Sequence, residues 1–318
     1  MKKKNIFIYT TLFCLITIFI NIKYLAYLYI ILLFSIRQFR LFLINLYYTI
    51  IYFIRFLSSK NDYRLNNNNR KEKIIVSLTT YSKRINTVFL AIESIFEQTA
   101  KPDKIVLWLD KNEFSIDTIP STLKKQIKQG LTVDFCDNIR SYKKLIPSLK
   151  KYPDDIIITI DDDIVYKNDC IENLYNAYLE DKNQVYCNYS FKFLSQDFRP
   201  VVNENKAYFL FNYIGTGAGT LFPPHILPDE IFNEDVFMKL APIHDDVFIS
   251  LLLQMYNINL VNVNKNYKYY IKLIQKRIII NTQSIGLFKE NSIKNKTKTQ
   301  LLNLLNHYGI ELKNINKF

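Results

Sequence analysis

Features that define several common protein classes are missing from this sequence of 318 residues. The four cysteines are scattered, with no CxxC motif or metal-ligand spacing, which excludes a disulfide-stapled peptide and indicates buried thiols in a reducing compartment. The three histidines lie too far apart to suggest a zinc site, and there is no internal repeat. With 49% hydrophobic and 15% aromatic residues, the chain is not a disordered tail either.

Acidic residues are nearly absent from the N-terminal part. Residues 1–72 hold 11 Lys and Arg but two acids, and so carry +9 of the net charge of +13. Residues 5–22 are uncharged and apolar, and at about 1.5 Å per residue they nearly span a hydrocarbon core. Shorter apolar runs follow over 24–36 and 41–54. No small-residue cleavage site follows the first run, so a removed signal peptide is disfavoured.

The flanking basic residues suggest how this part is oriented. Basic residues favour the cytoplasmic side of a membrane, and they lie at residues 2–4 and again from Arg55 onward. We therefore expect residues 1–57 to be a membrane anchor, either two spans or one span plus an interfacial helix. The rest of the chain would lie on the cytoplasmic face of a membrane, and the Asn, Lys and Ile content favours a bacterial inner membrane.

The remainder of the chain divides by composition. Residues 58–73 are polar, include four consecutive asparagines and lack an apolar period, which predicts a linker. Residues 74–264 are expected to form the main domain, and residues 265–318 a C-terminal extension of helix and loop with an amphipathic helix over 299–307. Basic residues do not form a face interleaved with aromatics, so nucleic acid is not an expected partner.

The main domain alternates short buried runs with helical patterns. Strands are predicted over residues 73–78, 104–109, 131–135 and 155–160, and helices over 85–98, 122–129 and 141–151. From residue 184 the pattern changes to short extended segments, a glycine-rich turn and a helix over 246–256. The predicted fold is α/β, a mixed, mostly parallel sheet flanked by helices.

Three consecutive carboxylates are the strongest chemical signal. Asp161, Asp162 and Asp163 come directly after the buried strand 156–160, where ligands bind in open α/β sheets. Adjacent carboxylates repel each other unless a cation is present, and Mg²⁺ or Mn²⁺ held by one or two of them and by substrate phosphates would satisfy the cluster. A solvated acidic loop is the alternative.

A second acidic pair, Asp245 and Asp246, opens an apolar helix. Carboxylates at a helix start are also ordinary caps that complement the dipole. Their functional interpretation is a general base that takes a proton from an acceptor hydroxyl, while a metal neutralises a leaving diphosphate.

From residue 74 to about residue 261 the chain resembles bacterial glycosyltransferases of the GT-A fold, similar to family 2 and to lipopolysaccharide and capsule enzymes. The residues that carry this resemblance are 76–81 (VSLTTY) with Arg84, 93–95 with 98–99, 102–104 with 108–109, 140–144 (RSYKK), 161–163 (DDD), 215–219 (GTGAG) with 221–224, and 245–246.

The resemblance implies a role for each matching position. The residues that would bind the nucleotide-diphospho-sugar are Thr79, Thr80, Tyr81, Arg84, Asp110, Lys144, Asp161 and Asp162. Asp161 and Asp163 match the DxD motif and would hold Mn²⁺ or Mg²⁺, with Asp161 also toward the ribose or sugar. Asp246 matches the catalytic base and Asp245 its neighbour, although Asp-Asp replaces the commoner Glu-Asp, so which of the two is the base stays open.

The predicted function is a metal-dependent glycosyltransferase that moves a sugar from a nucleotide donor to a glycan or lipid-linked acceptor in envelope biosynthesis, with inversion. The resemblance and the presence of one plausible base favour inversion. Two alternatives stay open. Asp161-x-Asp163-x-Val165 also fits a haloacid dehalogenase-like phosphohydrolase, although a βαβ unit precedes it here. A non-catalytic, membrane-bound glycan-binding protein is the other.

Overall fold

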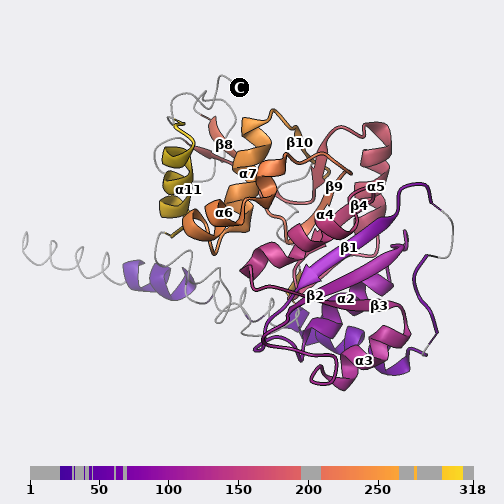
Figure 1. Cartoon of the computed structure of the whole chain (residues 1–318). Helices are drawn as coiled ribbons and strands as arrows, with labels where there is room; N and C mark the ends of the chain where they lie inside the picture. Colours follow the sequence, from indigo (N-terminus) through magenta and orange to yellow (C-terminus); the bar gives the residue numbers. More distant parts are fainter. Residues whose placement is uncertain are drawn as a thin grey trace, which may run out of the picture. The chain divides into compact units, whose positions relative to one another are not determined.

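The structure is a computed structural model, and it describes residues 22–30, 32, 39, 43–44, 46–60, 62–66, 70–194, 209–264, 276–277 and 296–310 (Figure 1). Two compact units divide the chain, residues 1–47 and 48–318. In the first unit the described residues are helical, and Tyr24 and Leu25 are among their exposed side chains. Across the described residues, no helix has both the length and the apolar character needed to cross a membrane. The span predicted over residues 5–22 lies, except for Ile22, outside them.

The second unit is built around a mixed sheet. Seven of the described strands form it, in the order β10-β6-β9-β4-β1-β2-β3. The strands β3, β2, β1 and β4 are mutually parallel, β9 is antiparallel to both β4 and β6, and β10 is parallel to β6. The strands of this sheet are β1 (Ile74–Thr79), β2 (Lys104–Asp110), β3 (Leu131–Cys136), β4 (Ile156–Ile160), β6 (Val185–Cys187), β9 (Ala218–Phe222) and β10 (Leu260–Asn262). The predicted mostly parallel sheet is confirmed.

Two small sheets and a set of helices complete the unit. The pair β5–β11 and the pair β7–β8 are each antiparallel. The small strands are β5 (Ile164–Val165), β7 (Ser190–Leu194), β8 (Phe209–Ile214) and β11 (Lys276–Arg277). The α-helices are α2 (Val88–Phe96), α3 (Ser121–Lys128), α4 (Ile146–Lys151), α5 (Cys170–Glu180), α6 (Glu234–Leu240), α7 (Asp245–Met255) and α11 (Lys296–His307), and the 3₁₀ helices are η1 (Arg140–Lys144) and η2 (Asp229–Phe232).

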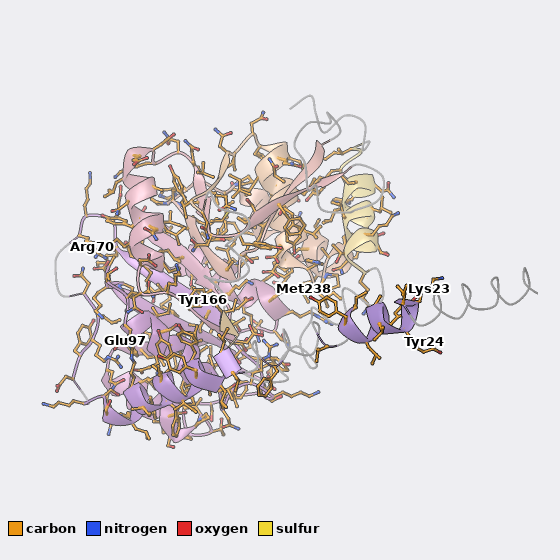
Figure 2. All side chains as sticks on the ribbon, turned by 180° about the vertical axis from the view of Figure 1, so that it is seen from behind. Lys23, Tyr24, Arg70, Glu97, Tyr166 and Met238 are labelled. Carbon is orange, nitrogen blue, oxygen red and sulfur yellow. The ribbon has the colours of Figure 1, made fainter. Side chains whose placement is uncertain are left out.

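Alternation along the strands creates two cores, one on each face of the sheet. Ile74, Val76 and Leu78 of β1 pack in one core with α2, α3 and α5, whereas Ile75 packs in the other with η1, α6, α7 and α11. Successive side chains of a strand point to opposite faces, so a central strand buried on both sides reads as a continuous apolar run. Figure 2 shows the side chains on the strands and helices that contribute to these cores. The predicted covering of the sheet by helices is confirmed.

One predicted helix is divided in the structure. The helix expected over residues 141–151 is η1 followed by α4, with Leu145 between them. Pro147 lies in the first turn of α4, where its missing N–H has no intrahelical partner to lose. A continuous helix would place this proline in its interior, where the ring clashes with the carbonyl four residues earlier.

The core also includes residues from the expected anchor and linker. Tyr52 and Phe56, on the helical residues 48–58, are buried, and the Phe56 ring lies 4.8 Å from that of Phe89 in α2. In the expected linker Leu65 is buried, and Arg64 forms a 2.8 Å salt bridge with the buried carboxylate of Glu93. Compositional patterns alone place these segments outside the domain, yet their side chains help to stabilise it.

Candidate active site

The strand order places the two predicted motifs side by side. The chain runs outward through β1, β2 and β3, then returns to form β4 on the other side of β1. The carboxyl ends of β1 and β4 are therefore neighbours at a point where the strand order reverses, which is where open α/β sheets bind ligands. Thr80 follows β1, and Asp161 follows β4.

Both oxygens of the middle carboxylate of the triplet accept hydrogen bonds from protein donors. Thr80 Oγ1 donates to Asp162 Oδ2 at 2.6 Å, and Arg84 Nη1 donates to Asp162 Oδ1 at 2.6 Å. The same guanidinium reaches Asp163, with Nη2 3.2 Å from Oδ2. Asp162 thus fixes the loop after β1 against the end of β4.

Asp161 is the outermost of the three, with 41% of its side chain exposed. Its backbone N–H is held by the hydroxyl of Tyr166 at 2.8 Å and by the carbonyl of Gly217 at 3.2 Å. A Cβ at position 217 would lie 1.9 Å from Asp161 Oδ2, so only glycine allows this approach. The glycine-rich segment therefore packs against the carboxylate of Asp161.

The second acidic cluster lies at the start of α7. Asp246 Oδ1 accepts a 2.9 Å hydrogen bond from the backbone N–H of Thr216, and its Oδ2 accepts one of 2.9 Å from the hydroxyl of Tyr213. The Thr216 hydroxyl also donates to Asp246, and it lies 3.1 Å from Asp245 Oδ2. The donors that hold Asp246 are neutral groups from β8 and the turn after it.

Lys144 joins the two clusters. Its Nζ is 3.0 Å from Asp161 Oδ1 and 3.1 Å from Asp245 Oδ2, and only 6% of its side chain is exposed. A buried ammonium with two carboxylate partners stays charged, and the pKa of Lys144 lies well above its usual range because these carboxylates outweigh burial. A single cation from η1 therefore connects the DDD segment to the helix that carries the candidate base.

The pKa values of the two aspartates at the start of α7 are shifted in opposite directions. Burial, and then the charge of Asp245, raise the pKa of Asp246 to about 6. The pKa of Asp245 is lowered, because the attraction of Lys144 and the hydrogen bonds to the carboxylate together exceed the opposing effect of burial. Burial also lowers the pKa of His244 to about 4, so this neighbour is neutral at neutral pH. Asp246 is therefore the carboxylate of this pair with the higher pKa, and Asp245 is the partner of Lys144. Burial likewise raises the pKa of Asp162, in the first cluster, to about 6.

The other predicted nucleotide-binding residues lie at the ends of β1 and β2 or directly after them. Thr79 Oγ1 donates to the backbone carbonyl of Trp108 at 2.8 Å. Asp110 is buried at the end of β2 and accepts a 2.9 Å hydrogen bond from the N–H of Asn112. The Arg84 guanidinium lies 5.6 Å from the ring centre of Tyr81. These contacts order the ends of β1 and β2 beside the two clusters.

The donor set is compatible with a divalent cation. Five carboxylates, Asp161 to Asp163 with Asp245 and Asp246, share two cations, Arg84 and Lys144, which leaves a formal charge of −3. Within the described residues, no three His, Cys, Asp or Glu side chains are grouped so that they could hold a metal ion by themselves. Mg²⁺ is commonly bound by one or two carboxylates and completed by substrate phosphates, so Asp161 and Asp163 fit this mode.

Several contacts of the site have no counterpart in the sequence analysis. Tyr213 lies in a short strand rich in aromatics, where its pattern cannot be distinguished from that of a core residue. His244 Nε2 lies 2.9 Å from Thr297 Oγ1, and Gln300 Oε1 accepts from the N–H of Ile243 at 3.2 Å. The C-terminal helix α11 therefore braces the segment before Asp245, a role that its amphipathic pattern does not reveal.

Comparison with known proteins gives weak likenesses only. No protein-family model matches the chain, and no curated protein matches it. A mannosyltransferase from Pyrobaculum calidifontis, solved in complex with GDP-Man and Mn²⁺, is 18% identical with a TM-score of 0.32, and the match covers 50% of this chain and 46% of that one. The chain thus matches less than half of that enzyme's length.

Two further solved structures are similar at the same level. A CMP:2-keto-3-deoxy-manno-octonic acid synthetase complexed with CTP is 12% identical, with a TM-score of 0.37 over 59% of this chain and 88% of that one. A 4-diphosphocytidyl-2C-methyl-D-erythritol synthase is 12% identical, with a TM-score of 0.41 over 70% of this chain and 99% of that one. Likenesses this low assign neither a family nor an activity to the chain.

Proposed function

We propose that the protein is a metal-dependent glycosyltransferase of the GT-A type, which transfers a sugar from a nucleotide-diphospho-sugar to an acceptor hydroxyl of a cell-envelope glycan. The observation that carries this proposal is the bridge by Lys144 between Asp161, after β4, and Asp245, before the candidate base. This bridge joins the carboxylates after β4, which would bind the donor, to the pair at the start of α7, which would accept a proton. Both lie where the strand order of the sheet reverses.

In this proposal the first cluster binds the donor. Thr79, Thr80, Tyr81 and Asp110, at the ends of β1 and β2, line the nucleotide. Asp161 and Asp163 would hold Mn²⁺ or Mg²⁺, which supplies positive charge to the diphosphate when bound. Arg84 and Lys144 lie beside these carboxylates, and a fixed cation near the diphosphate stabilises the charge that develops on the leaving group.

The second cluster activates the acceptor. The acceptor oxygen attacks the anomeric carbon of the sugar as the bond from that carbon to the diphosphate oxygen breaks, and the configuration inverts. Asp246 takes the proton of the attacking hydroxyl, and a pKa of about 6 suits a base that works near neutral pH. Asp245 keeps Lys144 in place and remains ionised.

We place this reaction at the cytoplasmic face of a membrane, with residues 1–47 as part of the anchor. The apolar runs in the sequence and the cytosolic supply of nucleotide sugars support this location. A lipid-linked acceptor is confined to the bilayer, so tethering the enzyme raises the effective concentration of the acceptor.

Donor hydrolysis by the full chain in detergent tests the proposal. The full chain is needed because Tyr52 and Phe56 pack in the core. A panel of nucleotide sugars is incubated with Mn²⁺ or Mg²⁺, and slow nucleotide release from one donor is expected, abolished by EDTA and by Asp163→Asn. Asp235→Asn is the matched control, since Asp235 is an exposed aspartate on α6 and should leave release unchanged.

The negative outcomes are equally informative. If no nucleotide sugar is hydrolysed or bound in a metal-dependent way, the transferase proposal is wrong. A covalent aspartyl-phosphate on Asp161 would instead indicate the phosphohydrolase. Metal-independent glycan binding that survives Asp163→Asn would indicate a binding protein.

A further inference from the structure

The helical residues 48–58 carry two apolar stripes. The first contains Tyr52 and Phe56, which are four residues apart and are buried against the domain. Phe56 packs on Phe89 of α2. This stripe fixes the orientation of the helix on the domain, and therefore also fixes which side of the helix faces outward.

The second stripe is exposed. Ile50, Phe53, Ile54 and Leu57 follow the helical spacing of one face, and Ile54 and Leu57 are 56% and 60% exposed. Phe53 touches Phe89 with its edge, and the other three side chains are large aliphatic groups at the surface. An ordered helix with an apolar outer stripe needs an apolar partner to cover it.

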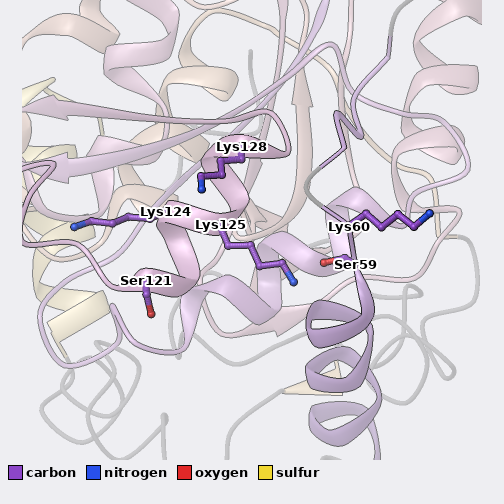
Figure 3. A pocket seen from close by; sticks show the side chains of 6 residues that line it. All are labelled: Ser59, Lys60, Ser121, Lys124, Lys125 and Lys128. Carbon is purple, nitrogen blue, oxygen red and sulfur yellow. The ribbon is translucent and has the colours of Figure 1, made fainter.

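Lysines line a hollow beside the end of this helix. An open hollow of about 500 Å³ is lined by Ser59, Lys60, Ser121, Lys124, Lys125 and Lys128, with no acid among them (Figure 3). Lys125 extends from α3 toward Ser59, and its Nζ donates to the carbonyl of Phe56 at 2.5 Å and lies 3.5 Å from that of Leu57. Since cations at a helix C-terminus are stabilising, Lys125 fastens the helix to α3 and keeps the lysines beside the apolar stripe.

We propose that the stripe Ile50, Phe53, Ile54 and Leu57 and the lysines Lys60, Lys124 and Lys128 together form a docking surface for an anionic lipid bilayer. The aliphatic side chains would enter the boundary between headgroups and acyl chains, and the lysines would contact lipid phosphates. We name these seven residues the docking surface.

Three observations favour a bilayer over a protein partner. The first is charge, because the hollow is lined by four lysines and no acid, which fits a phosphate-rich surface. The second is continuity, because three of the four stripe residues belong to the apolar stretch of residues 5–54, which contains no acid. The third is the pairing of an apolar helix face with flanking lysines, the pattern of helices that lie in a membrane interface.

Quenching of an introduced tryptophan tests the apolar part. Trp108 is the single native tryptophan and is buried in β2, so the unmodified chain supplies the background. The full-length Leu57→Trp variant is mixed with phosphatidylcholine vesicles that contain phosphatidylglycerol and bromine-labelled acyl chains. Strong quenching of the new emission is expected. Leu179→Trp, at a similarly exposed leucine of α5, is the matched control and should not be quenched.

Charge variants test the lysines. Lys124→Gln with Lys128→Gln, in the Leu57→Trp background, should lower the ratio of docked to undocked protein by about fivefold for each lysine. The electrostatic attraction of one lysine to an anionic membrane surface corresponds to a change of about this size in the binding equilibrium. Lys167→Gln with Lys239→Gln removes the same charge from lysines elsewhere on the domain and should leave the ratio unchanged. Added salt should weaken docking of the parent and bring it closer to the lysine variant.

Defined outcomes would overturn the proposal. Leu57→Trp emission that stays unquenched in these vesicles excludes membrane contact by the stripe. If the Lys124/Lys128 variant docks as well as the Lys167/Lys239 variant, Lys124 and Lys128 do not contribute to docking. Burial of the introduced indole that depends on protein concentration in lipid-free detergent would indicate a second copy of the chain instead. Circular dichroism verifies that each variant is folded. Fluorescence quenching does not require turnover, so the result tests the docking surface independently of the proposed transfer reaction.

Discussion

The two acidic clusters of the candidate site are balanced by different means. Asp162 and Asp163, after β4, are held by the guanidinium of Arg84, whereas Asp246, at the start of α7, is held by the neutral donors Thr216 and Tyr213. Burial raises the pKa of Asp162 to about 6 in spite of Arg84, and it raises the pKa of Asp246 to about 6 beside its neutral donors, whereas the pKa of Asp245 is lowered by Lys144 and by hydrogen bonds. In the proposed function the first cluster, which is tied to a guanidinium, binds charge, and the second cluster transfers the proton.

Asp246→Asn should produce the largest separation between the clusters. The amide keeps the size of the side chain but cannot accept a proton, so sugar transfer should fall by about 10²–10⁴-fold. Donor affinity should change little, because in the proposed function the donor is bound by the first cluster. Turnover and calorimetric binding of the donor, both with metal present, measure the two effects. A variant that loses donor binding as well would contradict the division between the clusters.

Lys144→Met should be the most destabilising change, because it leaves two carboxylates without their shared cation. The side chains of Lys144 and Asp245 are 6% and 8% exposed, and breaking a buried pair costs about 3–5 kcal/mol of the free energy of unfolding. Urea denaturation measures this loss. Lys182→Met, which breaks an exposed bridge to Glu72, is the control and should cost about 0–1 kcal/mol.

A double variant sharpens this result. Lys144→Met combined with Asp245→Asn removes both charges of the pair, so its loss of stability should be smaller than the sum of the two single losses. Additive losses would mean that Lys144 and Asp245 do not stabilise each other.

The sequence alone predicts the parallel part of the sheet better than the contacts between clusters. Buried strands such as 156–160 are continuous apolar runs, and helix starts such as Asp245 follow local rules, so short windows of sequence are sufficient. Tyr52 and Phe56 lie in a segment that is as apolar and aromatic as the runs before it. Nothing in the local sequence indicates that both side chains pack in the core, or that Phe56 contacts Phe89. The bridge by Lys144 joins residues that are 17 and 101 positions away, which only the tertiary fold brings together.

Tyr213→Phe should change the pH dependence of the second cluster alone. The lost hydroxyl donates to the ionised carboxylate of Asp246, so its removal disfavours that form and raises the pKa further above about 6. The base works only when deprotonated, and the acidic limb of the transfer rate should therefore move to higher pH, by about one pH unit for a hydrogen bond to a charged group. A pH–rate profile measures the shift.

Tyr142→Phe provides the control for this profile. It also removes a buried hydroxyl, which donates to the backbone carbonyl of Ala241 rather than to a carboxylate. The acidic limb of the pH–rate profile of Tyr142→Phe should stay at the same pH as in the unmodified protein. An unchanged limb in Tyr213→Phe itself would exclude Asp246 as the base that titrates in the profile.

The smallest expected effects come from two threonines that brace the clusters from outside. Thr297 of α11 contacts His244, whose Nδ1 lies 3.5 Å from the Tyr213 hydroxyl, while Thr87 donates to the carbonyl of Arg84 at 2.9 Å. Replacing either with valine removes one hydrogen bond and should cost about 0.5–1.5 kcal/mol of stability. Thr297→Val should lower turnover and spare donor affinity, because it loosens the support of the base. Thr87→Val should weaken donor binding and spare the pH profile, because it loosens Arg84. If both variants changed the same quantity, the two clusters would act as one unit, and the separate assignment of charge binding and proton transfer would be wrong.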